Sequence, residues 1–285
     1  MEHYLELENI SFKYEGIGGS QDNVLNNISL RLGKKECVAI VGPSGSGKTT
    51  LIQHFTGLLK PTSGRVLFQD EDIWTRRYNK TRLRRKIGIV FQFPETQLFE
   101  ETVEKDIAFG PQNLGLPVED IKRRIEEAMK DVDLSAEFYQ RSPFRLSEGE
   151  KRRAAIAGVL AMQPEMLVFD EPTAGLDPQN VQRFSQMLRG LLKTRSAVIV
   201  THNMDFVADM ADRVIALHNG SAAFDGSPRE LFRDAERVAS IGLELPTLSQ
   251  ILSARSDVPD CLKEVISLRE LQQKINDNCA QLPKV

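Results

Sequence analysis

The amino-acid sequence predicts an α/β fold built on an open sheet. Three short apolar runs carry this prediction, because each has the length of a strand that is covered on both faces: residues 37–41, 166–169 and 197–200. Glycine or polar residues follow each run, and segments with helical spacing lie between the runs. In such sheets ligands bind beyond the carboxyl ends of the strands, so we expect the functional site there.

The first run leads into a glycine-rich turn that carries the most specific motif in the chain. Gly42, four further residues and then Gly47-Lys48-Thr49 match G-x-x-x-x-G-K-[ST] between a strand and a helix. The glycines let the backbone N–H groups point inward as an anion-binding nest, and the helix amino terminus adds partial positive charge. Lys48 adds a full charge, and the Thr49 hydroxyl suits a Mg²⁺ ion that bridges the phosphates.

This turn is therefore predicted to bind the phosphates of ATP together with Mg²⁺. A structural loop of glycine and serine would not need a Lys-Thr pair at its end. The predicted nucleotide-binding residues of the turn are Gly42, Pro43, Ser44, Gly45, Ser46, Gly47, Lys48, Thr49 and Thr50.

The composition is that of an ordinary globular protein and gives no sign of a nucleic-acid binder. The chain has 285 residues, of which 41% are hydrophobic and 27% charged, and its net charge is −3. The apolar run at residues 154–162 is far shorter than the ~20 residues of a membrane helix, so we expect membrane contact through a partner. The amino terminus lacks the features of a secretory signal. Cys37, Cys261 and Cys279 show no metal-type pairing and indicate free thiols in a reducing cytosol.

Two alternating segments before the glycine-rich turn predict an antiparallel sheet, at residues 5–12 and 24–32. Tyr14 ends the first segment and by itself indicates packing. Further along, residues 75–86 contain seven Lys and Arg residues. A solvated face is favoured there over binding of nucleic acid or anionic lipid, because Tyr78 is the only aromatic residue in the run.

Functional side chains follow the predicted core strands. Gln92, Asp170, Glu171 and His202 each come directly after, or one residue after, an apolar run. Two carboxylates at the end of a buried strand are costly unless a cation or a reacting water uses them. We therefore expect these side chains at the carboxyl edge of the sheet.

The segment between Gln92 and Asp170 is predicted to be helical. Ile121, Ile125 and Met129 recur at helical spacing with charged residues between them. We expect an inserted helical subdomain at about residues 95–160, within an ATP-binding domain that spans residues 1–240.

The composition changes after Gly226-Ser227-Pro228. Residues 243–254 and 261–275 predict two short amphipathic helices around Pro259. Their apolar stripes suit docking onto another surface. Residues 241–285 are therefore predicted to form a C-terminal helical extension.

The phosphate-binding turn, the Asp170-Glu171 pair and His202, in this order, resemble the ATP-binding-cassette (ABC) ATPases. The resemblance covers about residues 4–240. It implies a P-loop NTPase fold with a mixed sheet core, an antiparallel β subdomain and an inserted helical subdomain.

The resemblance also implies a role for each residue that binds the nucleotide. Tyr14 would stack on adenine, and Lys48 and Thr49 would hold the phosphates and Mg²⁺. Gln92 would join the Mg²⁺ shell and sense the γ-phosphate, and Asp170 would orient the metal. These roles follow from position within the family's motifs.

The remaining roles concern catalysis. Glu171 would polarise the attacking water as general base, and His202 would bridge that water or the γ-phosphate to the rest of the site. The loop at residues 174–177 would couple two sites across a dimer. These side chains suit the reaction, because hydrolysis needs in-line positioning and charge neutralisation more than covalent catalysis.

In this family each ATP lies between the phosphate loop of one subunit and the signature Leu-Ser-Gly-Gly-Gln of the other subunit. In this chain residues 146–150 stand at the place of that signature and read Leu-Ser-Glu-Gly-Glu. Ser147, Gly149 and Glu150 would thus meet the partner's ATP, although Ser147 and Glu150 also form a plain capping box. Glu148 suits the helix dipole but not a phosphate. We expect an asymmetric pair, in which the site built with this signature is the weaker one.

Within the family, residues 91–99, 101–103 and 106–111 look most like the ATPases of energy-coupling factor (ECF) transporters, and among these the second A subunit. That resemblance implies a peripheral ATPase at the cytoplasmic face of the cell membrane. Such ATPases pair with a paralogous subunit and drive a membrane T component, to which an S component brings a vitamin or a transition-metal ion. The two-helix tail is similar too, and would help the two ATPases hold together.

A docking groove for the membrane partner is expected beside Gln92. Phe93, Pro94, Leu98 and Phe99 would line it, and a helix of the partner would sense the γ-phosphate state there. Alternatively, these apolar residues only pack the helical subdomain.

Other functions fit the sequence less well. A soluble ABC ATPase acting on nucleic acid or ribosomes usually has long coiled coils or two cassettes in one chain, and neither is visible. A P-loop kinase would not explain His202 after its own strand. A non-hydrolysing nucleotide-binding module would not need Lys48, Asp170 and Glu171 as well. This sequence does not identify the transported solute. The altered signature favours a heterodimer over a homodimer.

Overall fold

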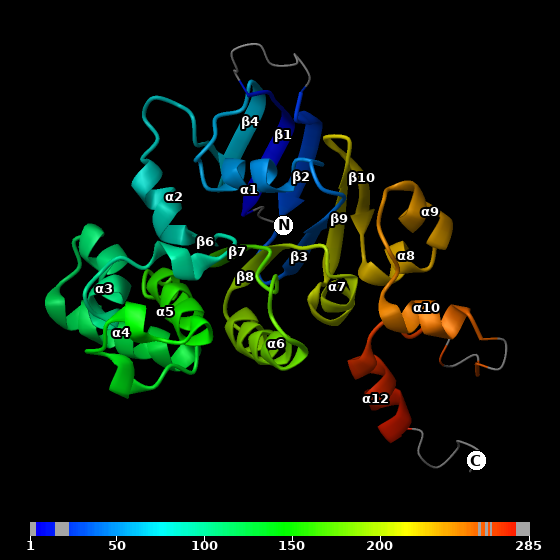
Figure 1. The fold of residues 1–285 in the computed structure, drawn as a ribbon. Coiled ribbons are helices and arrows are strands. Elements are labelled where there is room, and N and C mark those ends of the chain that lie inside the picture. Colours follow the sequence, from blue (N-terminus) through cyan, green and yellow to red (C-terminus); the bar gives the residue numbers. More distant parts are fainter. Residues whose placement is uncertain (1–3, 15–22, 256–257, 260–261, 263, 278–285) are drawn as a thin grey trace.

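Two β-sheets with surrounding helices form the protein (Figure 1). The computed structural model describes residues 4–14, 23–255, 258–259, 262 and 264–277. The first sheet is antiparallel and contains β1 (Leu5–Phe12), β2 (Leu25–Leu32), β4 (Ser63–Phe68) and β5 (Glu71–Asp72), in the order β2-β1-β4-β5. The second contains β3 (Cys37–Val41), β6 (Ile87–Val90), β7 (Met166–Asp170), β8 (Ser196–Val200), β9 (Arg213–His218) and β10 (Ser221–Gly226), in the order β10-β9-β3-β8-β7-β6.

The larger sheet is mixed, as the sequence predicts. Its strands β9, β3, β8, β7 and β6 pair in parallel, and only β10 runs antiparallel to its neighbour β9. Strand β3 is buried on both faces: Val38 and Ile40 share a core with the antiparallel sheet, whereas Ala39 and Val41 pack on the opposite face. Cover on both faces explains the unbroken apolar run.

Helices cover the sheets and extend from both ends of the molecule. The bounds of the α-helices are α1 (Lys48–Phe55), α2 (Lys80–Lys86), α3 (Val103–Asn113), α4 (Val118–Asp131), α5 (Glu148–Leu160), α6 (Pro178–Leu192), α7 (Met204–Met210), α8 (Pro228–Phe232), α9 (Ala235–Ser240), α10 (Thr247–Ser253) and α12 (Leu268–Asp277). Three 3₁₀ turns are η1 (Pro94–Gln97), η2 (Ala136–Phe138) and η3 (Pro143–Arg145). No helix in the described ranges is long and apolar enough to cross a membrane.

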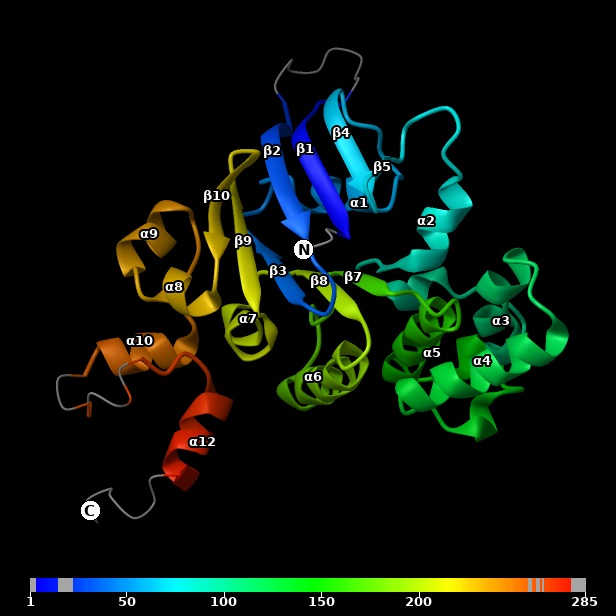
Figure 2. The same cartoon turned by 180° about the vertical axis from the view of Figure 1, so that it is seen from behind.

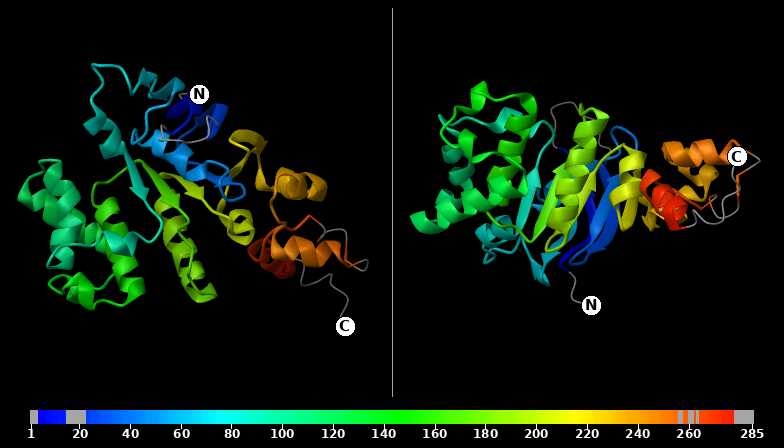
Figure 3. Two further views of the ribbon diagram at one scale, coloured as in Figure 1. Left: turned by 45° about the horizontal axis from the view of Figure 1, so that its top comes forward. Right: turned by 90° about the horizontal axis from the view of Figure 1, so that it is seen from below.

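The helical subdomain consists of α3, α4 and α5, and residues 91–165 contain no strand. Ile121, Ile125 and Met129 are buried on one face of α4, as their spacing predicts. This subdomain lies at one end of the molecule, and α8 to α12 lie at the other, as seen from behind in Figure 2 and in both views of Figure 3.

Strand β1 departs from the predicted alternation in its first half. Leu5, Glu6 and Leu7 are all buried. Glu6 is covered because β1 lies between β2 and β4, and its carboxylate accepts a hydrogen bond from Arg31 Nε on β2 at 2.6 Å. The regular register is also interrupted at Asn9, which has φ +50°.

The helices of the C-terminal extension differ from the predicted ones: the first begins later, and the second is interrupted at residues 265–267. Helix α10 begins at Thr247, because Pro246 precedes it and disfavours helical backbone at residue 245. Helix α12 begins at Leu268, where Ser267 Oγ accepts the Glu270 N–H in the manner of an N-cap. Part of the predicted second helix, including Cys261, lies outside the described residues, as does Cys279.

The basic run at residues 75–86 is largely a solvated face, as predicted, because its five arginines are exposed and its two lysines are half-buried. Arg82 pairs with Glu71, Lys86 pairs with Glu165, and Arg85 donates to the Leu114 carbonyl. Lys80 Nζ lies 3.4 Å from the centroid of the Trp74 ring. Several of these cations thus join α2 to neighbouring elements.

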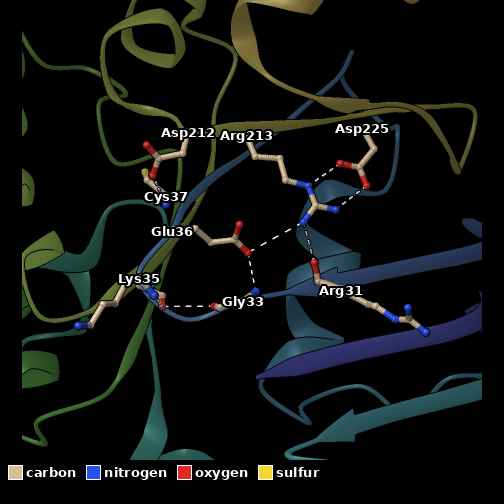
Figure 4. Close-up of polar contacts among 9 residues, drawn as sticks. Arg31, Gly33, Lys35, Glu36, Cys37, Asp212, Arg213 and Asp225 are labelled. Carbon is tan, nitrogen blue, oxygen red and sulfur yellow. Dashed lines mark hydrogen bonds and ion pairs between the residues drawn. The ribbon is translucent and has the colours of Figure 1, made fainter. Parts of the chain in front are cut away.

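A polar network fixes the amino end of β3, opposite the predicted site (Figure 4). Arg213 donates to both carboxylate oxygens of Asp225 and to the Arg31 carbonyl, which joins the two sheets. Asp212 accepts the Cys37 N–H at 2.9 Å. Cys37 is a free thiol, as predicted, and burial raises its pKa to about 12, with the nearby Asp212 and Glu36 carboxylates adding to the shift.

Candidate functional site

The phosphate-binding turn connects the end of β3 to the first turn of α1. Glycine is required at two of its positions by close approach. At Gly42, with φ +148°, a Cβ would lie 2.2 Å from the Leu217 carbonyl oxygen; at Gly47, with φ +96°, it would lie 2.7 Å from Leu25 Cδ2. Helix α1 starts at Lys48, so its first N–H groups face the turn.

Lys48 is held across the turn. Its ammonium group donates to the carbonyls of Gly42 at 2.8 Å and Pro43 at 2.9 Å. Burial lowers the pKa of Lys48, while the carboxylates of Glu171 and Asp170 oppose that shift. These two carboxylates favour the charged form of Lys48, which lies where the phosphate oxygens of ATP would bind.

Asp170 and Thr49 place two oxygen atoms side by side, and both are of the kind that binds Mg²⁺. The Thr49 hydroxyl donates to Asp170 Oδ2 at 3.1 Å, and Asp170 is 6% exposed at the end of β7. Burial raises the pKa of Asp170, the Glu171 charge adds to this, and the Thr49 hydrogen bond opposes it. A buried carboxylate beside a hydroxyl fits a hard divalent cation. Ser46 of the same turn is buried, and its hydroxyl has no hydrogen-bond partner among the described residues.

Glu171 and His202 face each other across two neighbouring strands. His202 Nδ1 lies 2.9 Å from Glu171 Oε2; the His202 side chain is 74% exposed and that of Glu171 is 14% exposed. This approach is an ion pair only when the imidazole is protonated, and it leaves Glu171 Oε2 without a directed hydrogen bond. Glu171 has φ +47°, a backbone conformation that is uncommon outside glycine and concentrates at functional sites.

One cavity of about 350 Å³ collects these residues. Its lining comprises Val24, Ser44, Gly45, Gly47, Lys48, Thr49, Thr50, Gln92, Asp170, Glu171, Val200 and His202. Gln92 reaches it from the end of β6, on the far side of β7. Val24 and Val200 also line the cavity, but the sequence did not predict this. Their only sequence signal is a position at the end of a predicted strand.

Some predicted nucleotide residues lie beside this cavity. Tyr14 is 56% exposed, and its hydroxyl is 3.1 Å from that of Thr50, which ties it to α1. Gly42 and Pro43 line a second cavity next to the first. Ser147, Gly149 and Glu150 belong to the start of α5 and do not line the cavity of their own chain.

Known proteins are similar to this chain in both sequence and fold. A family model described as ABC transporter matches residues 25–174. The chain belongs to the ABC transporter family. It is 44% identical to the energy-coupling factor transporter ATP-binding protein EcfA2 of Clostridium tetani, with 87% of each chain covered. It is 50% identical to the EcfA2 protein of Geobacillus kaustophilus, with 77% of each chain covered.

Solved ABC structures agree with this assignment. The structure of cbiO1 from Clostridium perfringens, described as part of the ABC transporter complex cbiONQ, has a TM-score of 0.75 at 36% identity and covers 89% of this chain and 100% of its own. The ATP-binding cassette MJ0796, a dimer bound to ADP and Pi, has a TM-score of 0.68 at 29% identity and covers 79% and 98%. The predicted ABC fold and ATPase class are confirmed.

The ABC signature region has the capping box that its sequence predicts. Ser147 N and Oγ both donate to Glu150 Oε2, at 2.8 and 2.7 Å, and Glu150 N donates to Ser147 Oγ at 3.4 Å. These bonds lower the pKa of Glu150. Glu148 is exposed and pairs with Lys151 at 2.7 Å. The ABC signature of this chain therefore holds two carboxylates, of which Glu150 caps the helix and Glu148 pairs with a lysine on the same helix.

The loop at residues 174–177 follows Glu171 and leads into α6. Asp177 caps α6 by accepting the Asn180 N–H at 3.0 Å. Arg152 of α5 is buried and donates to the carbonyls of Pro172 and Ala174. The signature helix is thus bonded directly to the loop after the predicted general base.

The groove predicted beside Gln92 is wrong in its position: a cavity lies near it, but only two of the four predicted residues line that cavity. A cavity of about 510 Å³ lies between α2, α3 and α5, and Leu98 and Phe99 line it. Phe93 and Pro94 do not, because the chain turns at η1, which begins with the buried Pro94. Gln92 belongs to the nucleotide cavity instead. The remaining lining residues are Thr81, Arg84, Gln97, Asp106, Phe109, Gly110, Asn113, Leu114, Ala154, Ala155, Gly158, Val159 and Met162.

Proposed function

We propose that this chain is the ATP-hydrolysing subunit of an ECF-type importer. One observation carries the proposal: a single cavity brings together the phosphate-loop lysine, a carboxylate–hydroxyl pair for Mg²⁺, and a second carboxylate in contact with a histidine. The similarity to ECF transporter ATP-binding proteins supports the transport role.

The proposed mechanism assigns one task to each side chain. Lys48 and the N–H groups at the start of α1 bind the β- and γ-phosphates. Glu171 orients the attacking water and accepts its proton. His202 lies against Glu171 and bridges the water or the γ-phosphate to the site, and Gln92 senses whether the γ-phosphate is present.

Mg²⁺ would be held by Thr49, with Gln92 and Asp170 completing the site. When bound, the ion would neutralise charge on the phosphate oxygens. Asp170 suits this task because its carboxylate already approaches the Thr49 hydroxyl.

A composite dimer completes each site. Ser147, Gly149 and Glu150 would approach the γ-phosphate bound by the partner subunit. The Ser147 hydroxyl is engaged by Glu150 in this chain, and Glu148 adds a second negative charge. Both features disfavour an anion there, so a heterodimer with a paralogous ATPase is preferred over a homodimer.

The partners we propose are this paralogue and two integral membrane proteins, a T component and an S component that brings a vitamin or a transition-metal ion. A helix of the T component would lie in the groove between α2, α3 and α5. Exposed Phe99 and Phe109, with ring centroids 5.0 Å apart, offer it an apolar contact, and Arg84 and Asp106 line its polar part. The chain would be peripheral to the cytoplasmic face of the cell membrane.

Affinity purification from membranes tests this function. The tagged chain should recover a second ATPase and integral membrane proteins. A Phe99→Ala variant should lose the membrane proteins and keep the second ATPase, whereas Val118→Ala, an exposed apolar position on α4 outside the groove, should keep both. Recovery of ribosomes or DNA instead would support the soluble ABC ATPase and contradict the transport role.

A further inference from the structure

The C-terminal extension contacts the loop that carries His202. A cavity of about 420 Å³ lies between them. One wall is formed by Gly42, Pro43, Ser44 and residues 202–205, and the other by residues 242–245 with Thr247 and Gln250. Ser44 and His202 line both this cavity and the nucleotide cavity, so the extension and the nucleotide cavity are separated by His202 and Ser44.

A two-point hydrogen bond joins the two walls. The Thr247 N–H donates to Asp205 Oδ1 at 2.7 Å, and the Thr247 hydroxyl donates to Asp205 Oδ2 at 2.6 Å. Thr247 is the first residue of α10 and Asp205 lies in the first turn of α7. Both oxygens of one carboxylate are thus satisfied by one residue of the extension, which is a short, charge-assisted contact.

Apolar packing places the extension on the elements that lead to the site. Leu243 and Leu245 pack against a buried cluster that contains Val41, at the end of β3, and Met204, at the start of α7. Gly242 lies so close to the phosphate loop that a Cβ there would be 3.5 Å from Pro43 Cγ. The extension therefore contacts both the strand before the phosphate loop and the helix after His202.

The position of His202 depends mainly on its backbone. Its side chain is largely exposed and contacts Glu171. The backbone before it is fixed by the Thr201 N–H, which donates to the Ile40 carbonyl at 3.2 Å. The backbone after it enters α7, whose first turn is capped by Asn203 and joined through Asp205 to Thr247.

We propose that Asp205 and Thr247 are a positioning pair that sets His202 against Glu171, so that the extension tunes hydrolysis in addition to any part in dimer contact. This rests on the catalytic roles proposed above for His202 and Glu171. Loss of the pair lets α7 and the His202 backbone shift, which affects turnover more than nucleotide binding, because Lys48 and the phosphate loop stay in place.

Thr247→Val tests the pair, since valine has nearly the shape of threonine without the hydroxyl. In the assembled transporter complex we expect kcat for ATP to fall about fivefold or more, with KM unchanged within about twofold. Thr247→Ser, which keeps the hydroxyl, should restore kcat. Ser253→Ala is the matched control, because the Ser253 hydroxyl bonds only within α10, to the Gln250 carbonyl; its kcat should equal that of the unmodified chain.

Three outcomes would overturn the inference. If Thr247→Val and Asp205→Asn leave kcat unchanged while His202→Ala abolishes turnover, the positioning pair fails and the proposed hydrolysis stands. A loss of subunits from the Thr247→Val complex, seen by its mass in solution, would assign the effect to assembly. If His202→Ala itself keeps full turnover, the proposed role of His202 fails first, and the pair has nothing to position.

Discussion

The nucleotide cavity and the signature helix of this chain differ in how closely they keep the ABC pattern. In the cavity, Lys48, Thr49, Asp170, Glu171 and His202 all stand where the family's motifs place them, and the structure brings them together. At the start of α5, two of the five signature residues are replaced by glutamate. The residues that we propose for metal binding and hydrolysis of the chain's own ATP lie together, whereas the signature that we propose it lends to a partner is altered.

This difference supports our proposal that the two composite sites of a heterodimer with a paralogous ATPase are not equivalent. Charge explains why. The cavity opposes its two carboxylates with Lys48, whereas the signature presents Glu148 and Glu150 on the helix end that would otherwise attract an anion. The predictions below test each half separately.

The largest effect is expected in the intact half, at Glu171. Glu171→Gln keeps the size of the side chain and removes its basicity, so ATP should still bind while kcat falls about 100-fold or more. The dimer should then stay closed on unhydrolysed ATP, which light scattering would detect as a persistent dimer. Substantial residual hydrolysis would rule out Glu171 as the general base.

The next largest effect is expected at Lys48. Lys48→Ala removes the ammonium group that we propose binds the phosphates, and the affinity for ATP should fall about 10–100-fold. A fluorescent nucleotide titration of the isolated chain measures this. Lys34→Ala is a suitable control, because Lys34 lies at the opposite end of β3 and its ammonium stacks on Tyr4; equal affinities for both variants would contradict the binding role of Lys48.

A smaller effect, in the opposite direction, is expected at Glu148. Glu148→Gly and Glu148→Gln remove the negative charge, and the ATPase rate of the assembled pair should rise about two- to fivefold, because the pairing with Lys151 already offsets part of the repulsion. Glu119→Gly, at an exposed position in the first turn of α4, controls for glycine in a helix. An unchanged rate for both Glu148 variants would refute the weakened half-site.

The smallest effect is expected at Ser147, where an alanine variant separates the structural role of the capping box from its proposed role in hydrolysis. Ser147 and Ser227 each form a capping box, with Glu150 and Glu230 respectively. Alanine at either serine should lower the unfolding midpoint by about 2–4 °C, through loss of an N-cap. Only Ser147→Ala should also slow ATP hydrolysis by the pair; equal rates for the two variants would show that Ser147 is a cap and nothing more.

The sequence predicted the cavity well because its signals are local. A phosphate loop must follow a buried strand, and carboxylates at strand ends must lie at one edge of a parallel sheet, so Lys48, Asp170 and Glu171 could be placed together without further information. The apolar periodicity of α4 likewise identified its buried face.

Other features depended on tertiary contacts that no local pattern encodes. The pairing of Asp205 with Thr247 joins residues 42 positions apart, and either residue alone is an ordinary helix-start residue. Pro94 was assigned to the groove because it is apolar and near Gln92, but the turn at η1 buries it elsewhere. The alternation at residues 5–12 placed Glu6 on the solvent side, but β1 lies between β2 and β4 and Glu6 is covered there, with its carboxylate paired with Arg31.

Dilution of the isolated chain tests most directly whether ATP is hydrolysed only between two subunits. We expect the ATPase rate per molecule to fall toward zero as the isolated chain is diluted, and to return when the paralogous subunit is added at constant concentration of this chain. A rate per molecule that stays constant and high down to the most dilute monomer would contradict the composite site.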